Sequence, residues 1–493
     1  MSETVELKIA DGKIEGLLYD GIAAYLGIPY GRPPVGELRW RPPQPAEPWE
    51  DVRDCTFFGP SCVQGPRSFQ SAMYPKSFRN LDEAGYSEDC LNLNVWTKND
   101  SREGKPVIVF FHGGAFAAGG SSAPVYDGTY LASLDVVFVS VNFRLGIFGL
   151  FVHPELAAES ENGTAGNYML MDQLLALKWV RNNIAAFGGD PFNVTVMGQS
   201  SGAASAEILA ASPAARGLLK NAAVLSYILI DRPFPTQEEM LSSVHTELSI
   251  EELRSMPAEQ LMIYPDFERN HWLPVVDNGI IPCSMAQLYA SGLANNFNMM
   301  LGTVGGDSMI GGPFAVMDEQ RPSASSFIYR VNLMNSFGDD LAPAVLALYP
   351  DDTPELLEES VEHLKRDNLQ WLPYRTAKAR AEHNEGSTYL YNIICSYPER
   401  EALGAFHGVD IPYWLGTIDY QPADLLTEYL VNFARTGCPE SDEVPEWRPF
   451  DGHYRYLAVP DTDTNEVHEI GSRCDGFWEN YPGPAKSGSR KTK

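Results

Sequence analysis

Residues 198–202 have the sequence Gly-Gln-Ser-Ser-Gly, which fits the pattern G-x-S-x-G. They follow an apolar run, 194–197, that indicates a strand, and precede a run of small residues, 203–210, that indicates a helix. A serine on so sharp a strand-to-helix turn projects its hydroxyl outward, and the glycines remove side chains that would clash. The pattern therefore predicts that Ser200 is a nucleophile; an ordinary tight turn is the alternative.

A second candidate feature is the stretch 112–116, His-Gly-Gly-Ala-Phe, which follows the apolar run 107–111. A nucleophile that attacks a carbonyl carbon needs backbone N–H donors aimed at the developing oxyanion. Glycines let the backbone come close without a Cβ in the way. We predict that the donors are the N–H groups of Gly114, Ala115 and Ser201, the last acting through its backbone and not its hydroxyl. A simple turn after a strand is the alternative.

A nucleophilic serine needs a histidine that takes its proton and a carboxylate that orients the histidine. His407 lies in a loop late in the chain, and Asp307 follows the strand-like segment 297–302. This chain order, serine, acid and histidine, is the one expected after such a turn. The chain has nine histidines and many acids, so the residue types alone leave both assignments open. Asp410 is a second candidate for the acid.

The elements that must position these residues alternate between strands and helices. This pattern predicts an α/β fold with a central, mostly parallel twisted sheet and helices on both faces. Residues 5–18 indicate a β-hairpin that turns at Asp11-Gly12. Uninterrupted apolar runs indicate strands buried on both faces, at 91–96, 107–111 and 136–142, and further strands are expected at 194–197, 297–302 and 388–396. Helical spacing predicts helices at 172–187, 203–210, 340–349 and 423–436.

The segment 231–277 is acidic, helical in pattern and rich in methionine and proline. It predicts a helical cap over a pocket, with connecting helices at the sheet edge as the alternative. We interpret residues 1–493 as a single domain, although ~150 residues per domain would also allow three.

The charge balance excludes several classes of function. The chain has 65 acidic residues against 36 lysines and arginines, a formal net charge of −29. A nucleic-acid binder needs a basic footprint, so nucleic acid is excluded as a partner. The basic stretch 486–493 is short and rich in glycine and serine, and we predict a disordered tail there.

The sequence also lacks several other signals. The apolar runs are far shorter than the ~20 residues of a membrane span. There is no P-loop and no clustered His/Cys spacing, so we expect no metal and no cofactor. The N-terminus has no basic and apolar segments of the signal-peptide kind, so we predict a cytoplasmic location, with secretion as the alternative.

At this level of detail the chain resembles the type-B carboxylesterases, the cholinesterase-like branch of the α/β-hydrolases, over nearly its full length. The matching blocks include GIPYGRPPVGELRWRPPQP from Gly27, SEDCLNLNVW from Ser87, VFFHGGAFAAG from Val109, VNFRLGIFG from Val141, DQLLALKWVRNNIAAFGGDPFNVTVMGQSSGAAS from Asp172, GTVGGDS from Gly302 and GAFHGVDIPYWLG from Gly404. The chain is most similar to microbial carboxylesterases without a signal peptide.

The resemblance implies a role for several residues of this chain. Ser200 would be the nucleophile, His407 the base and Asp307 the acid, with the oxyanion hole at Gly114, Ala115 and Ser201. It further implies a possible disulfide between Cys62 and Cys90 and a buried ion pair between Arg39 and Glu88.

The chain departs from the family at several positions. The acid is more often a glutamate, and Asp307 is one methylene shorter, so its loop must lie closer to His407. Asn80 occupies the place of an aromatic residue that lines the choline site of cholinesterases, so the chain is not expected to be one. Met169 replaces a glycine, and 225–227 differ from the usual Gln-Ser-Gly, which makes the pocket wall different.

The expected activity is that of a serine carboxylic-ester hydrolase that cleaves neutral, small to medium esters through an acyl-enzyme. A lipase and an amidase or carbamate hydrolase are the alternatives within the enzyme class. A catalytically inactive binding module is the alternative of a different class, but such relatives typically lose the serine or the histidine. The sequence leaves the oligomeric state and the natural ester open.

Overall fold

The computed structural model describes residues 3–65, 75–161, 163–230, 234–243, 246–264, 267, 272–277, 279–307, 325–383, 386–398, 404–420, 422–453, 455–459, 466–469 and 475–480. Over these residues the chain forms a 13-stranded sheet with the order β1-β2-β3-β7-β9-β8-β10-β11-β12-β13-β14-β15, and β4 pairs with β2. The predicted tail, 486–493, lies outside the described residues, as does Ser308.

The N-terminal part of the sheet is antiparallel. β1 (Glu3–Ile9) and β2 (Gly12–Tyr19) form the predicted hairpin, with Ile9 opposite Gly12. β3 (Ile22–Pro29) follows and pairs with β7 (Asn92–Lys98), while the short β4 (Val52–Asp54) lies beside β2. This part supplies the edge of the sheet that is farther from the nucleophile.

The central strands are parallel to one another, as predicted. They are β9 (Val137–Val141), β8 (Lys105–Phe111), β10 (Gly189–Gln199), β11 (Asn221–Leu225), β12 (Asn298–Val304), β13 (Thr388–Ile393) and β14 (Arg455–Val459). The strand β15 (Glu466–Glu469) closes the edge in the antiparallel sense. Every residue of β8, β9, β11 and β13 is buried, which explains why their sequences lack polar alternation.

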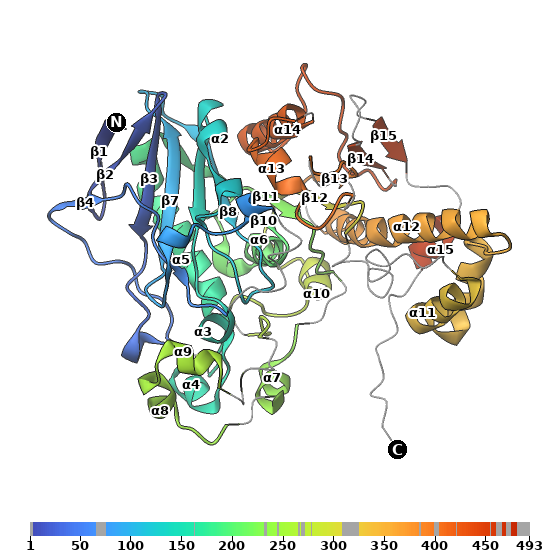
Figure 1. Cartoon of the computed structure of the whole chain (residues 1–493), viewed down its shortest axis with the longest axis horizontal. Coiled ribbons are helices and arrows are strands. Elements are labelled where there is room, and N and C mark those ends of the chain that lie inside the picture. The colour runs from blue at the N-terminus through green and yellow to red at the C-terminus, as the bar shows by residue number, and fades with distance from the viewer. Residues whose placement is uncertain are drawn as a thin grey trace.

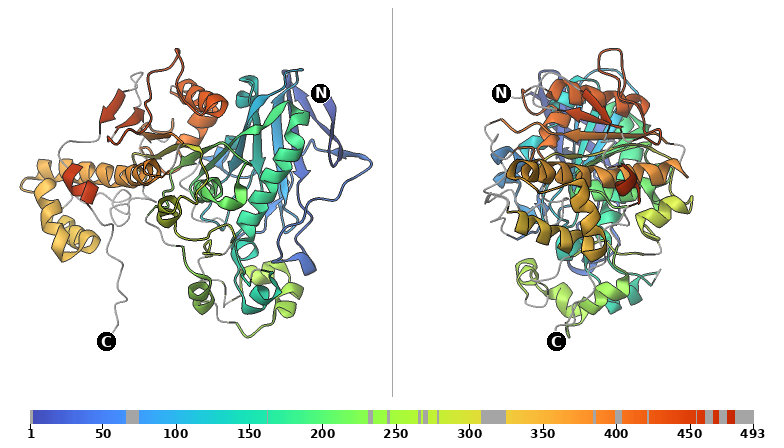
Figure 2. Two further views of the ribbon diagram at one scale, coloured as in Figure 1. Left: turned by 180° about the vertical axis from the view of Figure 1, so that it is seen from behind. Right: turned by 90° about the vertical axis from the view of Figure 1, so that its right-hand side faces the viewer.

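Helices cover both faces of this sheet, so each central strand contributes to two cores (Figures 1 and 2). On β8, Val107 and Val109 pack on one side and Ile108 and Phe110 on the other. The first core receives α5 (Tyr168–Asn183) and α6 (Ser201–Ala211). The second receives α2 (Thr129–Ser133), α13 (Asp410–Leu415) and α14 (Ala423–Thr436). The predicted α/β layering is thus confirmed.

The remaining helices lie at the periphery. α3 (Gly146–Leu150), α4 (Pro154–Glu159) and α10 (Met285–Ala290) connect strands, and the segment predicted as a cap contains the short helices α7 (Gln237–Ser243), α8 (Ile250–Ser255) and α9 (Ala258–Met262). The long helices α11 (Ser326–Leu348) and α12 (Pro354–Ala381) pack with α15 (Asp475–Asn480) around a third apolar cluster, at the right of Figure 1.

The predicted helix at 172–187 begins earlier, at Tyr168, and its last turn is a 3-10 helix, Ile184–Phe187. It ends at Gly188, whose φ of 80° only glycine adopts readily. The predicted helix at 340–349 is the second half of α11. No helix was predicted at α12, whose interior proline, Pro373, interrupts the sequence signal.

An ion pair with Arg39 fixes the segment around this residue to the end of the helix α8. Arg39 donates to Glu88 through Nε at 2.7 Å and Nη2 at 2.6 Å, as the family resemblance implied. The remaining Nη1 donates to the carbonyl oxygens of Leu253, Arg254 and Met256, at the end of α8. Arg39 therefore satisfies the last carbonyls of that helix and the carboxylate together.

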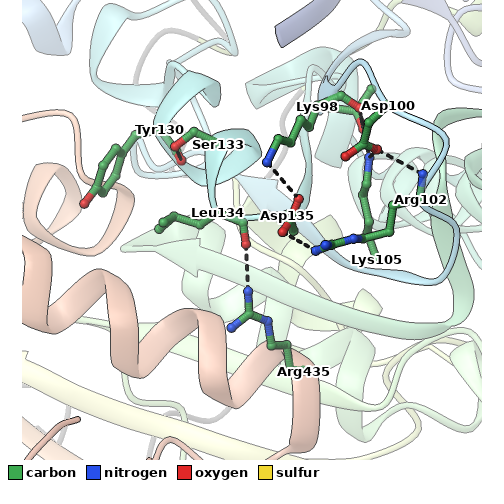
Figure 3. Close-up of polar contacts among 10 residues, drawn as sticks. Lys98, Asp100, Arg102, Lys105, Tyr130, Ser133, Leu134, Asp135 and Arg435 are labelled. Atoms are coloured by element: carbon green, nitrogen blue, oxygen red, sulfur yellow. Dashed lines mark hydrogen bonds and ion pairs between the residues drawn. The ribbon is translucent and has the colours of Figure 1, made fainter. Parts of the chain in front are cut away.

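A polar cluster joins the amino ends of the central strands (Figure 3). Lys105, the first residue of β8, is buried, and its Nζ contacts Asp100 Oδ1 at 2.7 Å and Lys98 O at 2.9 Å. Asp135, just before β9, pairs with Arg102 and with Lys98 at 3.4 Å. The cluster lies at the edge of the sheet opposite to the carboxyl ends of these strands.

Replacing Lys105 by methionine should lower the free energy of unfolding by about 1–3 kcal/mol, because the hydrogen bonds of its buried ammonium group to Lys98 O and Asp100 Oδ1 are lost. The matched control is Arg448→Ala, which removes a pair between two exposed side chains, Arg448 and Glu446. Arg448→Ala should lower the free energy of unfolding much less than Lys105→Met, because solvent screens the exposed pair. Urea unfolding of both variants measures the difference, and equal losses would contradict the role given to Lys105.

Candidate active site

The predicted nucleophile lies at the junction of β10 and α6. Ser200 has φ 56° and ψ −129°, a conformation that non-glycine residues rarely adopt. Its N–H donates to Leu225 O at 2.9 Å, and its own carbonyl accepts from Ala204 N–H at 3.1 Å. Strained residues of this kind persist only where the surroundings hold them, and they concentrate at functional sites.

The two glycines of the pattern allow this turn to form. A Cβ on Gly198 would overlap the carbonyl group of Gly202. A Cβ on Gly202 would overlap the carbonyl oxygen of Phe111, the last residue of β8. The absence of side chains at both positions therefore lets the turn lie directly against the end of β8.

The predicted oxyanion loop follows β8 at that point. Gly114 has φ 128°, and a Cβ there would overlap the carbonyl of Ala118. Ala115 and Phe116 have φ values of 55° and 61°. The loop touches the nucleophile, since a Cβ on Gly113 would lie 3.1 Å from the Cβ of Ser200.

The three N–H groups expected in the oxyanion hole are available. Within the described residues, no hydrogen bond links the N–H of Gly114, Ala115 or Ser201 to a protein acceptor. The first of these is nevertheless fixed in place, because Gly114 O accepts from the N–H groups of Ala117 and Ala118 at 3.1 and 3.0 Å. Fixed donors without a protein partner are what a developing oxyanion requires.

The structure brings His407 and Asp307 together although they are far apart in the sequence. Nδ1 of His407 lies 2.9 and 3.0 Å from the two carboxylate oxygens of Asp307, and both side chains are buried. The two loops meet at Gly306, whose N–H donates to Ala405 O at 2.9 Å. A Cβ on Gly306 would lie 2.8 Å from that oxygen, so a glycine here lets the two loops approach closely. This close approach lets the aspartate, which is shorter than a glutamate, reach His407.

The surroundings of His407 set its protonation. Burial lowers the pKa of His407, but the charge and hydrogen bond of Asp307, together with the charge of Asp410, outweigh it and raise the pKa above its usual value. Asp410, the second candidate acid, accepts instead from the hydroxyl of Tyr391 at 3.3 Å. Burial raises the pKa of Asp410 to about 7. Asp307 and not Asp410 thus contacts Nδ1.

The other ring nitrogen, Nε2, points to a different residue. It lies 3.2 Å from Nε2 of Gln199, the residue that precedes the nucleophile. In the described part of the chain, no hydrogen bond joins it to the hydroxyl of Ser200, although both residues line the same pocket. Catalytic hydrogen bonds are commonly long in enzymes without substrate and shorten when it binds. The sequence reasoning did not single out Gln199.

The pocket has a cavity volume of about 90 Å³. It is lined by Phe78, Asn80, Gly113, Gly114, Ala115, Gly119, Gly120, Tyr126, Gln199, Ser200, His407, Gly408 and Ile411. Apart from His407, none of these residues is an aspartate, glutamate, lysine, arginine or histidine. Among the residues that the structure describes, none from the segment 231–277 belongs to this lining.

Of the positions where the sequence departs from the family, Asn80 lines the pocket and the others lie behind it or in the core. Asn80 lines it and donates from Nδ2 to Ser61 Oγ at 3.2 Å. Ser226 has φ 57° and donates its N–H to Gly302 O at 2.9 Å, next to the turn at Ser200. The ring of Tyr227 packs edge-on against Phe116 of the oxyanion loop, and Met169 is buried in the core.

The two cysteines of the possible disulfide are neighbours in the fold. Cys62 and Cys90 are both buried and are thiols in this structure. A hydrogen bond to Cys62, together with burial, raises the pKa of the Cys90 thiol. The two thiols lie close enough to contact each other, and the disulfide between them stays a prediction.

Two further properties concern possible ligands and membranes. Among the residues that the structure describes, no three His, Cys, Asp or Glu side chains gather as metal ligands would. None of the described helices combines the length and apolar character needed to cross a membrane.

Comparison with known proteins places the chain in the carboxylesterase family. The carboxylesterase family profile matches residues 2–475. The para-nitrobenzyl esterase of Bacillus subtilis (strain 168) is 32% identical over 481 residues, which cover 92% of this chain and 94% of that protein. The fumonisin B1 esterase of Sphingopyxis macrogoltabida is 32% identical over 474 residues, covering 89% and 83%.

Solved structures agree with the sequence comparison. A PNB esterase structure superposes with a TM-score of 0.78 at 28% identity, covering 97% of this chain and 99% of that one. The predicted α/β-hydrolase fold is thereby confirmed, with its mostly parallel sheet and interspersed helices. The chain belongs to the carboxylesterase family, type B, and is a hydrolase of that family.

Proposed function

We propose that the protein is a serine carboxylic-ester hydrolase that uses Ser200 as nucleophile, His407 as base and Asp307 as the orienting acid. The observation that carries this proposal is the contact of Asp307 with Nδ1 of His407 in the pocket that also holds the strained Ser200. The fixed N–H groups beside Ser200 support it.

The geometry leads to a two-step reaction. Ser200 Oγ attacks the ester carbonyl carbon while its proton moves to His407 Nε2. The resulting oxyanion accepts from the N–H groups of Gly114, Ala115 and Ser201. His407 then gives its proton to the leaving alcohol, and an acyl-enzyme remains. Water, activated by His407 in the same way, releases the acid and restores Ser200.

Neutral, small to medium esters are the substrate class that the pocket favours. Its lining offers no acidic or basic side chain other than His407, and its cavity volume is about 90 Å³. A charged substrate would lose its hydration there without gaining a partner. The esterase names of the two relatives support hydrolysis of esters.

Ser200→Ala should lower ester turnover by several orders of magnitude, because the reaction loses its nucleophile. Ser201→Ala should have a mild effect, since only the backbone N–H of this residue is used. Ester hydrolysis by both variants measures the contrast, and circular dichroism checks that both fold. A serine-directed phosphonate should label Ser200 in the parent protein, and an adduct on another serine would contradict the assignment.

The rate constant kcat/KM should rise with pH and reach half of its plateau above ~6.5, the ordinary pKa of histidine. The base must be neutral to accept a proton, and Asp307 raises the pKa of His407, so the protonated form persists to higher pH. Asp307→Asn should lower kcat by ~10⁴. Asp410→Asn is the matched control, and a loss as large as that of Asp307→Asn would move the role of acid to Asp410.

A neutral ester should be hydrolysed with a higher kcat/KM than an analogue that carries a carboxylate. The net charge of −29 repels anions, and the pocket lining offers them no cation. Added salt screens charges beyond ~10 Å at 0.1 M, so the discrimination should shrink with ionic strength. Equal values of kcat/KM for the two esters at low salt would show that charge does not determine selectivity.

A further inference from the structure

We propose that Gln199 positions His407 by hydrogen bonding to Nε2, the atom that must receive the proton of Ser200. This inference rests on the proposed function, because it assumes that His407 is the base. It adds a residue to the site that the assignment of the nucleophile, base and acid leaves out.

The backbone fixes where the side chain of Gln199 begins. Gln199 is the last residue of β10 and lies opposite Leu225 in the parallel pairing with β11. Its side chain is 5% exposed, so it has little freedom to leave the pocket. The position of Gln199 at the end of β10 and its burial therefore fix the carboxamide in the pocket.

The neighbouring glycines leave space for the carboxamide between the oxyanion loop and His407. A Cβ on Gly113 would lie 2.8 Å from Oε1 of Gln199. On the other side, a Cβ on Gly408 would lie 3.5 Å from Nε2 of Gln199. A side chain at position 113 would thus crowd Oε1, and one at position 408 would come into ordinary contact with Nε2.

The direction of the hydrogen bond follows from the other side of the ring. Nδ1 faces both oxygens of Asp307, so Nδ1 carries the proton of the neutral imidazole. Nε2 then presents a lone pair, and the amide N–H of Gln199 is the donor at 3.2 Å. In the protein without substrate, Gln199 therefore holds Nε2, and the hydroxyl of Ser200 takes its place at this lone pair when the ester binds.

A carboxamide can also accept. Once Nε2 has taken the proton of Ser200, an amide N–H facing it would be repelled. A half-turn of the amide group brings Oε1 into its place, where it accepts from the imidazolium. Glutamine can therefore hold the ring in either protonation state whenever Nε2 is not engaged with Ser200 or the leaving alcohol, whereas a carboxylate favours the imidazolium and an apolar side chain holds neither state.

Two carboxyl groups among the described residues act on the pKa of His407. They are Asp307, from the loop after β12, and Asp410, at the start of α13, which is itself bonded to Tyr391 of β13. Both carboxyl groups favour the imidazolium. The neutral amide at Nε2 adds no further negative charge, so it leaves the base available at neutral pH.

The test compares the pH dependence of kcat/KM for a neutral nitrophenyl ester in three variants and the parent protein. In Gln199→Glu the carboxylate should stabilise the imidazolium and move the half-plateau point up by about one pH unit. In Gln199→Met, which keeps the length but removes the hydrogen bond, kcat should fall several-fold while KM changes little. The point of half-plateau should move less than in Gln199→Glu.

Asn80→Asp is the matched control. It places a carboxylate in the same pocket on a residue that contacts Ser61 and not His407. Its half-plateau point should move by less than half the shift of Gln199→Glu, so the comparison separates direct contact from added charge. Equal shifts in the two variants, or an unchanged midpoint in Gln199→Glu, would overturn the proposal.

Each preparation is first titrated with a serine-directed phosphonate, and the labelled peptide is identified by mass spectrometry. Labelling of Ser200 in all variants shows that the proposed nucleophile stands, so an unmoved midpoint then counts against Gln199 alone. Labelling elsewhere would instead show that the proposed function is wrong.

Discussion

The close approach of the turn at Ser200 to the end of β8 is the constraint on which the site depends. Gly202 lies against the carbonyl oxygen of Phe111, and Gly198 lies against Gly202 itself. Any side chain at either position would push the strand end and the helix apart. The oxyanion loop begins at the next residues of the chain, so the same contact fixes the distance between the nucleophile and the N–H groups expected to serve it.

The strained backbone of Ser200 needs support from both sides, and the fold provides it. On the strand side, the N–H of Ser200 is bonded to Leu225 O, and Ser226 to Gly302 O, so three neighbouring strands hold the turn. On the helix side, every residue of α6 is buried. Glu207, on the last turns of α6, accepts from Tyr289 of α10 at 3.0 Å. A helix held along its whole length cannot rotate to release the strain at its first residue.

The sequence predicted the central elements of the fold because their signals are local. Uninterrupted apolar runs mark strands that are buried on both faces, and the glycine pattern marks a turn that no other residue permits. The strand β11 has only five residues and was missed, and the proline in α12 concealed a long helix. The pocket lining could not be read in the same way, because it comes from loops whose positions depend on tertiary contacts. The described residues of the segment predicted as a cap, 231–277, are absent from the lining.

The same distinction applies within the site. The pattern around Ser200 is contiguous, so its turn could be predicted from residue types. Asp307 and His407 meet only because Gly306 lets two distant loops touch, and residue types alone left them open until the family resemblance was considered. Gln199 was beyond sequence reasoning, because a glutamine beside a serine has no chemical signal until a histidine from another loop reaches it.

The electrostatics of the molecule separate the surface from the site. A net charge of −29 resides on many carboxylates, yet the pocket lining contains none. The two carboxyl groups whose charges act on His407, those of Asp307 and Asp410, are buried. Burial holds the pKa of Asp410 near 7, so at neutral pH this group carries only part of a charge, while Asp307 contacts the imidazole directly. A second full charge there would favour the imidazolium and withdraw the base. The neutral carboxamide at Nε2 likewise adds no negative charge beside the ring. The pKa of His407 therefore depends mainly on one carboxylate, that of Asp307.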